Sequence, residues 1–221
     1  MSLACPAWTT PDEIALARKW ADAQLAALGI TTRGEPRSVK QGAISVVWRQ
    51  ATDAGDVFFK AVPELFAPEP PLTEWLARRW PAHIPTVLAS DRARRWMLTR
   101  AVEGAVLSDV DAPEAWTATV RALARIQMDS VGRTGELSER GCPARSLAAL
   151  PAELDVVLKT AVRRCAGTEH AVPGEIVRAI ETRRDTLGAE AERLAGYGLP
   201  VTLIHGDFVA GNVIVTAAAR R

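Results

Sequence analysis

The segment VTLIHGDFVAGNVIV (residues 201–215) decides how the rest of the chain is interpreted. A short apolar run leads into a polar loop, and a second apolar run follows the loop. Short apolar runs bounded by turn-forming residues are typical of strands. The segment therefore predicts a strand over 201–204, a loop over 205–212 and a second strand over 213–215.

The loop carries a carboxylate, Asp207, five residues before a carboxamide, Asn212, and His205 precedes the Asp by two residues. Phosphoryl-transfer loops use this arrangement, because a proton acceptor and a metal-binding oxygen must face one phosphate. In that role Asp207 accepts a hydroxyl proton and Asn212 holds Mg²⁺. The alternative is a polar hairpin turn capped by the two side chains.

HGDFVAGN (residues 205–212) resembles the HGD-x-x-x-x-N loop of the aminoglycoside phosphotransferase family of small-molecule kinases. The resemblance implies an α+β, bilobal protein-kinase-like fold, with an N-terminal helix and antiparallel sheet in one lobe and a mainly helical second lobe. It places a nucleotide-binding lobe at 1–102 and an incomplete helical lobe at 103–221. The implied reaction is transfer of the γ-phosphoryl group of ATP to a hydroxyl of a small molecule, an aminoglycoside or a related compound, with ATP and Mg²⁺ as cofactors.

A second candidate group is Lys60, which lies in the otherwise apolar run VFFKAV (residues 57–62). A lysine within an apolar strand is costly unless it reaches solvent or pairs with an anion. The family resemblance makes Lys60 the lysine that contacts the α- and β-phosphates, and it favours Glu69, at the start of a predicted helix, as its carboxylate partner. The residues alone leave Glu64 and Glu74 open as partners, and they also leave open an edge-strand lysine that faces solvent.

Two β-prone runs over 39–48 are joined at Gln41, Gly42 and Ala43, and a third run follows at 56–62. These runs predict three antiparallel strands. Because glycine permits close approach, the backbone N–H groups of this turn are candidates to cover the phosphates of ATP. An ordinary hairpin turn is the alternative.

The remaining pattern predicts helices and one further hairpin. The first helix follows a Thr10–Glu13 capping box, and 84–89 and 96–100 form the hairpin. The buried stripe of the first helix is predicted as Ile14, Ala17, Ala21, Leu25 and Leu28. That of a later helix, which ends near Asp129, is predicted as Trp116, Val120, Leu123 and Ala124. Further helices are predicted over 147–165 and 173–194.

Composition limits the partners. The formal net charge of the 221-residue chain is +1, and 24% of its residues are charged. Such a balance argues against nucleic acid or an anionic membrane surface as the main partner. No stretch is apolar over the roughly 20 residues that span a bilayer, and a cytoplasmic location is expected by default.

The resemblance also implies a second metal-binding Asp a short way after Asn212, and the sequence ends at Arg221 before such a residue. We therefore expect a truncated family member, in which the strand that should pair with residues 212–215 is absent and an apolar edge stays exposed for self-association. The alternative to a kinase is a non-catalytic nucleotide-binding or interaction protein.

Overall fold

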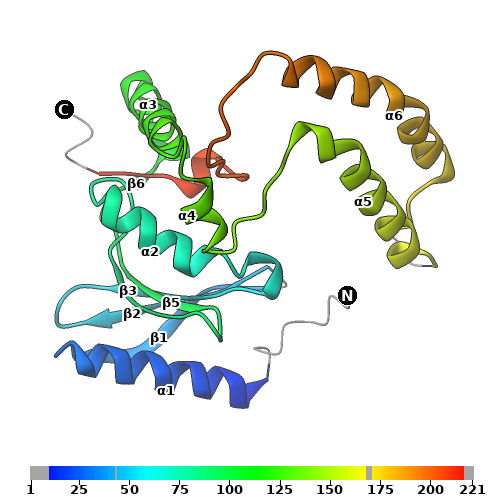
Figure 1. Ribbon diagram of the computed structural model, residues 1–221. Coiled ribbons are helices and arrows are strands. Elements are labelled where there is room, and N and C mark those ends of the chain that lie inside the picture. Colours follow the sequence, from blue (N-terminus) through cyan, green and yellow to red (C-terminus); the bar gives the residue numbers. More distant parts are fainter. Residues whose placement is uncertain (1–9, 43, 168–170, 217–221) are drawn as a thin grey trace. The chain divides into compact units, whose positions relative to one another are not determined.

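The computed structural model describes residues 10–42, 44–167 and 171–216 (Figure 1). The chain divides into two compact units, one of Met1–Cys142 with Thr202–Arg221 and one of Pro143–Val201. All the candidate site residues belong to the first unit. The lobe boundary expected at 102/103 is defined by function rather than by compactness, and it stays a prediction.

The first unit contains an antiparallel sheet of five strands in the order β1-β2-β3-β5-β4, counted over the described residues. Its strands are β1 (Thr32–Gln41), β2 (Val46–Thr52), β3 (Val57–Ala61), β4 (Val87–Asp91) and β5 (Trp96–Arg100). The predicted hairpins are confirmed by the β1–β2 and β4–β5 pairs. Strand β1 starts earlier than predicted. Nothing in the sequence pattern indicates its first part, because the residues of β1 are almost all exposed and show no apolar alternation.

Helix α1 (Pro11–Ala27) starts at the predicted cap. The hydroxyl of Thr10 accepts a hydrogen bond from the Glu13 N–H at 3.4 Å. Ala17, Ala21 and Leu25 are buried. Leu28 lies beyond the last helical turn and is 51% exposed, so its predicted place in the buried stripe is wrong.

Alternation along β3 assigns a helix to each face of the sheet. Phe59 lies in a cluster with Ala17 and Leu25 of α1. Lys60, one residue further, points to the opposite face and pairs with Glu69 of α2 (Glu69–Arg79). Figure 1 shows α1 and α2 on either side of the sheet.

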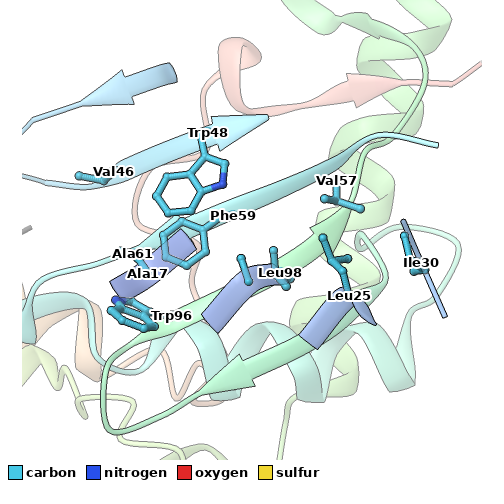
Figure 2. Close-up of a cluster of buried hydrophobic side chains, with 11 residues drawn as sticks. Ala17, Leu25, Ile30, Val46, Trp48, Val57, Phe59, Ala61, Trp96 and Leu98 are labelled. Carbon is cyan, nitrogen blue, oxygen red and sulfur yellow. The ribbon is translucent and has the colours of Figure 1, made fainter. Parts of the chain in front are cut away.

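The core of this unit is an aromatic cluster between α1 and the sheet (Figure 2). The Phe59 ring, 1% exposed, stacks on Trp48 with centroids 3.8 Å apart. Trp20 and Trp96 meet the same ring edge-on, at 6.1 and 5.9 Å. Offset and edge-on aromatic pairs add stability beyond the area they bury, so β3 is held firmly at the position before Lys60.

A second, two-stranded sheet joins β6 (Ala105–Val106) to β7 (Ile214–Val215), with Ala105 opposite Val215. The 3-10 turns η3 (Leu107–Asp109) and η5 (Ala210–Asn212) flank these strands. Strand β6 thus pairs with one edge of β7. Self-association through the other edge stays a prediction.

Gly104 owes its place to the close approach of β7. A β-carbon at Gly104 would lie 2.4 Å from the Val215 carbonyl oxygen and 2.7 Å from Cγ2 of Ile214. We predict that Gly104→Ala lowers the free energy of unfolding by about 1–3 kcal/mol, the usual cost of overpacking. Urea titration measures the loss. Gly135→Ala is the control, because a β-carbon at Gly135 would have no atom within 4 Å outside its own helical turn; equal stability of the two variants would contradict the close approach.

Helices α3 (Pro113–Asp129) and α4 (Thr134–Ser138) follow the second sheet's first strand in the first unit. Helix α3 ends as predicted. Its predicted buried stripe is wrong at Trp116 and Val120, which are 44% and 59% exposed, whereas Leu123 and Ala124 are half-buried. Ala115 is buried instead, in a small cluster with Leu107 and Val215. The side of α3 that packs beside the second sheet thus includes Ala115 rather than the predicted Trp116.

The second unit is helical, as predicted. After η4 (Leu147–Ala149) it consists of α5 (Leu150–Cys165) and α6 (Gly174–Ala195) over its described residues. An ion pair between Asp155 and Arg184 joins the two helices. Within the described ranges, no helix is both long and apolar enough to cross a membrane.

Candidate functional site

Lys60 and Glu69 form an ion pair between β3 and the first residue of α2. Lys60 is centred in the sheet, opposite Val47 of β2 and Met97 of β5. Its side chain is 32% exposed and that of Glu69 is 31% exposed. An ammonium has three N–H donors, so pairing with Glu69 orients Lys60 while donors remain for an anionic ligand.

The structure distinguishes Glu69 from the other two candidate partners. Glu74 accepts a hydrogen bond from the Ser90 hydroxyl of β4. Glu64 lies in a separate 3-10 turn, η2 (Glu64–Phe66). Glu69 also lies at the N-terminus of α2, where the helix dipole favours a negative charge. Binding of phosphates by this pair stays a prediction.

The β1–β2 turn contains the other predicted nucleotide-binding residues. Gln41 ends β1 opposite Val46, and it is exposed. The N–H of Gly42 donates to the Ser45 carbonyl at 3.1 Å, so this amide closes the turn rather than facing outward. Ala43 lies outside the described residues. A phosphate-covering role for the turn remains a prediction.

Asp207 and Asn212 lie together in the loop before β7. The Asn212 amide Nδ2 donates to Oδ2 of Asp207 and to the Asp207 carbonyl oxygen, each at 3.0 Å. Both residues are exposed. The amide nitrogen is thus used to hold the Asp207 side chain, which leaves Oδ1 of each side chain as an accepting oxygen. Oδ1 of Asp207 is suited to accept a hydroxyl proton, and Oδ1 of Asn212 is suited to bind a cation.

Local backbone geometry shapes this loop. Gly206 has a φ of 76°, a conformation that favours glycine. The ring of His205 accepts the Asp207 N–H at Nδ1 over 3.3 Å and meets Phe208 edge-on at 5.5 Å. The His205 imidazole thus binds the backbone of its own loop.

The loop is anchored at both ends. On the C-terminal side, β7 pairs with β6 and the Leu107 N–H donates to the Val213 carbonyl at 2.9 Å. On the N-terminal side, the Leu203 N–H donates to the hydroxyl of Ser130, which is 1% exposed, at 2.7 Å. The strand predicted over 201–204 is wrong: this segment has no regular secondary structure, and the Ser130 hydroxyl accepts a hydrogen bond from one of its backbone N–H groups. Sequence reasoning missed Ser130, because a lone serine after a helix gives no signal of a contact 73 residues away.

The oxygens of Asp207 and Asn212 are of a type that Mg²⁺ binds, but they could supply only part of its coordination shell. Carboxylate and carboxamide oxygens are ligands that Mg²⁺ accepts, and Mg²⁺ commonly keeps waters and substrate phosphates as its other ligands. Among the described residues, no group of three or more His, Cys, Asp or Glu side chains could hold a metal ion by itself. A cation at Asn212 would therefore depend on the phosphates that it accompanies.

A five-stranded antiparallel sheet with a lysine–glutamate pair, followed by helices and an Asp–Asn loop, defines a protein-kinase-like phosphotransferase fold. The chain belongs to the phosphotransferase enzyme family abbreviated APH, whose family model matches residues 35–221. Among solved structures, the chain is similar to one titled macrolide 2'-phosphotransferase type I. The match has a TM-score of 0.58 and 14% sequence identity, and it covers 95% of this chain and 69% of the other. No curated protein matched the sequence.

Proposed function

We propose that this protein transfers the γ-phosphoryl group of ATP to a hydroxyl group of a small molecule. The observation that carries the proposal is the Asp207–Asn212 hydrogen bond, which aligns a carboxylate and a carboxamide within one exposed loop. Membership of the phosphotransferase family supports the reaction class. ATP, when bound with Mg²⁺, supplies the phosphoryl group and the charge neutralisation that transfer requires.

In this proposal each residue has a separate task. Lys60, oriented by Glu69, binds phosphate oxygens through its remaining N–H donors. Asp207 orients the acceptor hydroxyl and accepts its proton as the oxygen–phosphorus bond forms and the bond to ADP breaks. Asn212 keeps Asp207 in place through Nδ2 and presents Oδ1 to the cation. Positioning and electrostatics provide most of the acceleration in such reactions.

The acceptor is an open part of the proposal. The similar solved structure is titled a macrolide phosphotransferase, and the sequence resemblance points to aminoglycosides. We therefore propose a panel that contains a macrolide, several aminoglycosides, simple sugars and choline-like amino alcohols. Mass spectrometry of each acceptor after incubation with the protein and magnesium ATP detects one added phosphoryl group. Transfer to any acceptor supports the proposal.

Nucleotide affinity, measured on the same protein by calorimetry, separates the remaining outcomes. ATP binding without transfer to any acceptor would favour the alternative, a non-catalytic nucleotide-binding protein. If the protein neither binds ATP nor transfers a phosphoryl group to any acceptor, the proposed function is contradicted altogether.

We predict that Lys60→Met weakens ATP binding by about 10- to 100-fold, because a hydrogen bond to a charged group contributes about 1.5–3 kcal/mol. The methionine keeps much of the aliphatic stem but has no charge and no donor. Calorimetric titration with magnesium ATP measures the change. Lys19→Met is the matched control, because Lys19 is an exposed lysine of α1, on the other face of the sheet. Equal ATP affinities for the two variants would contradict the role of Lys60.

A further inference from the structure

The C-terminal end of α2 is held by a carboxylate from α3. Arg79, the last residue of α2, donates from Nε to Oδ2 of Asp129 at 3.0 Å and from Nη2 to Oδ1 at 3.2 Å. The next residue, Trp80, donates from its indole nitrogen to Oδ2 of the same carboxylate at 3.3 Å. A bidentate arginine–carboxylate pair fixes orientation as well as distance. Both side chains are about 30% exposed, at 28% for Arg79 and 30% for Asp129.

A second carboxylate, from α4, holds the middle of the same helix. The indole nitrogen of Trp75, a residue only 5% exposed, donates to Oε2 of Glu136 at 2.9 Å. Arg133 donates to Oε1 of Glu136 at 3.1 Å, and its other terminal nitrogen lies 3.8 Å from Asp129. The Arg79 guanidinium lies 5.0 Å from the centroid of the Trp75 ring. The two carboxylates, from α3 and α4, thus belong to one polar network that binds side chains of α2.

Both carboxylates are charged at neutral pH. The hydrogen bond from Arg79 is the main reason that the pKa of Asp129 lies below its ordinary value. The hydrogen bonds from Trp75 and then Arg133 lower the pKa of Glu136. Charge-assisted hydrogen bonds are stronger than neutral ones. At neutral pH all the hydrogen bonds to these two carboxylates are therefore of the stronger, charge-assisted kind.

Helix α2 links this network to the lysine pair. It has 11 residues, Glu69 is its first residue and Arg79 its last. At 1.5 Å per residue such a helix is a rigid rod of roughly 16 Å. A rotation or slide at its C-terminal end therefore moves Glu69 relative to Lys60 of β3, which is fixed by its two neighbouring strands.

We propose that Asp129 and Glu136 are positioning residues, which hold α2 so that Glu69 stays paired with Lys60. They touch neither Lys60 nor Glu69 themselves and act through the helix. The inference rests on the proposed function only for the use of the pair in phosphate binding. The pairing itself is testable in the nucleotide-free protein.

The test measures how fast an amine-acylating reagent modifies Lys60, relative to Lys19, with peptide mass spectrometry as the readout. Asp129→Asn keeps the shape of the side chain but removes its charge. We expect it to raise the Lys60/Lys19 rate ratio by about two- to fivefold, the factor by which a partly exposed ion pair shifts an equilibrium. Arg79→Lys, which keeps the charge but loses the bidentate geometry, should raise the ratio in the same direction. Glu69→Gln sets the upper reference, because it removes the partner directly.

Two controls separate positioning from a general loss of stability. Glu139→Gln removes a neighbouring carboxylate that is 79% exposed and lies 4.0 Å from Arg140, and it should leave the ratio unchanged. Leu107→Ala removes a side chain that is 3% exposed in the cluster beside the second sheet, which includes no residue of α2. It shows how far lost stability alone raises the ratio, with urea titration used to compare variants at equal fractions folded.

A larger rise in Asp129→Asn than in Leu107→Ala supports the inference. A rise no larger than that of Leu107→Ala would reduce the network to a stabilising role and overturn it. An unchanged ratio in Glu69→Gln would also overturn it, because the pair would then not hold Lys60 in solution. None of these outcomes depends on ATP or on an acceptor, so a failure here is distinct from a failure of the proposed phosphoryl transfer.

Discussion

Asp207→Asn is expected to reduce the rate of phosphoryl transfer by about 10²- to 10⁴-fold, the usual contribution of a general base. The substitution changes little else in the loop. An asparagine at 207 still offers an oxygen to the Asn212 amide, which now donates to the carboxylate at 3.0 Å. The variant loses only the basicity with which it accepts the proton of the acceptor hydroxyl. Steady-state kinetics with the acceptor identified by the panel would measure the fall in kcat.

Folding and nucleotide affinity serve as internal checks on that result. Far-UV circular dichroism and ATP affinity should match those of the unmodified protein, because Lys60 and Glu69 lie on other elements. Asp109→Asn is the matched control, since Asp109 is an exposed aspartate of η3 with no assigned role. A rate within the range of this control would show that Asp207 is not the base.

The sequence predicts those parts of the fold whose pattern is local. Strand β3, which contains Lys60, is a short apolar run, and the cap at Thr10 lies beside the helix it starts. The Asp–Asn spacing likewise lies within one loop. Such features depend on neighbours in sequence, which a single chain displays directly.

The features that sequence reasoning missed depend on partners far along the chain. Ser130 holds Leu203, so the segment over 201–204 is not a strand. The edge strand β1 faces solvent along most of its length and therefore carries no apolar period. The partner of Lys60 also depends on contacts that the sequence does not display. The residues alone allow three glutamates, and the folded chain pairs Glu74 with Ser90 and Glu69 with Lys60.

Family resemblance supplied what the residues alone left open at Glu69, but the pairing of β7 with β6 was not predicted. Strand β7 pairs with β6, which follows β5 closely in sequence. Gly104 shows the physical condition for that pairing, since its missing side chain lets β7 approach. A glycine between two strands is thus a packing requirement.

The largest loss of stability is expected from Phe59→Ala, at about 3–5 kcal/mol in the free energy of unfolding. The ring is 1% exposed and is enclosed by three tryptophans, so its removal leaves a cavity that rigid indoles cannot readily fill. A loss of this size is a large share of the roughly 5–15 kcal/mol that typically stabilises a domain. Urea titration followed by tryptophan fluorescence measures it.

Phe58→Ala is the matched control, because it removes the same ring one residue earlier on the same strand. Phe58 points to the opposite face, where it is half-buried and lies 5.9 Å from the Arg49 guanidinium. We expect a loss of about 1 kcal/mol there, the common size for a single substitution. Equal losses would mean that the α1 face of the sheet is no better packed than the Lys60 face. A much larger loss for Phe59 would show that the aromatic cluster fixes β3, so that the strand presents Lys60 from a rigid support.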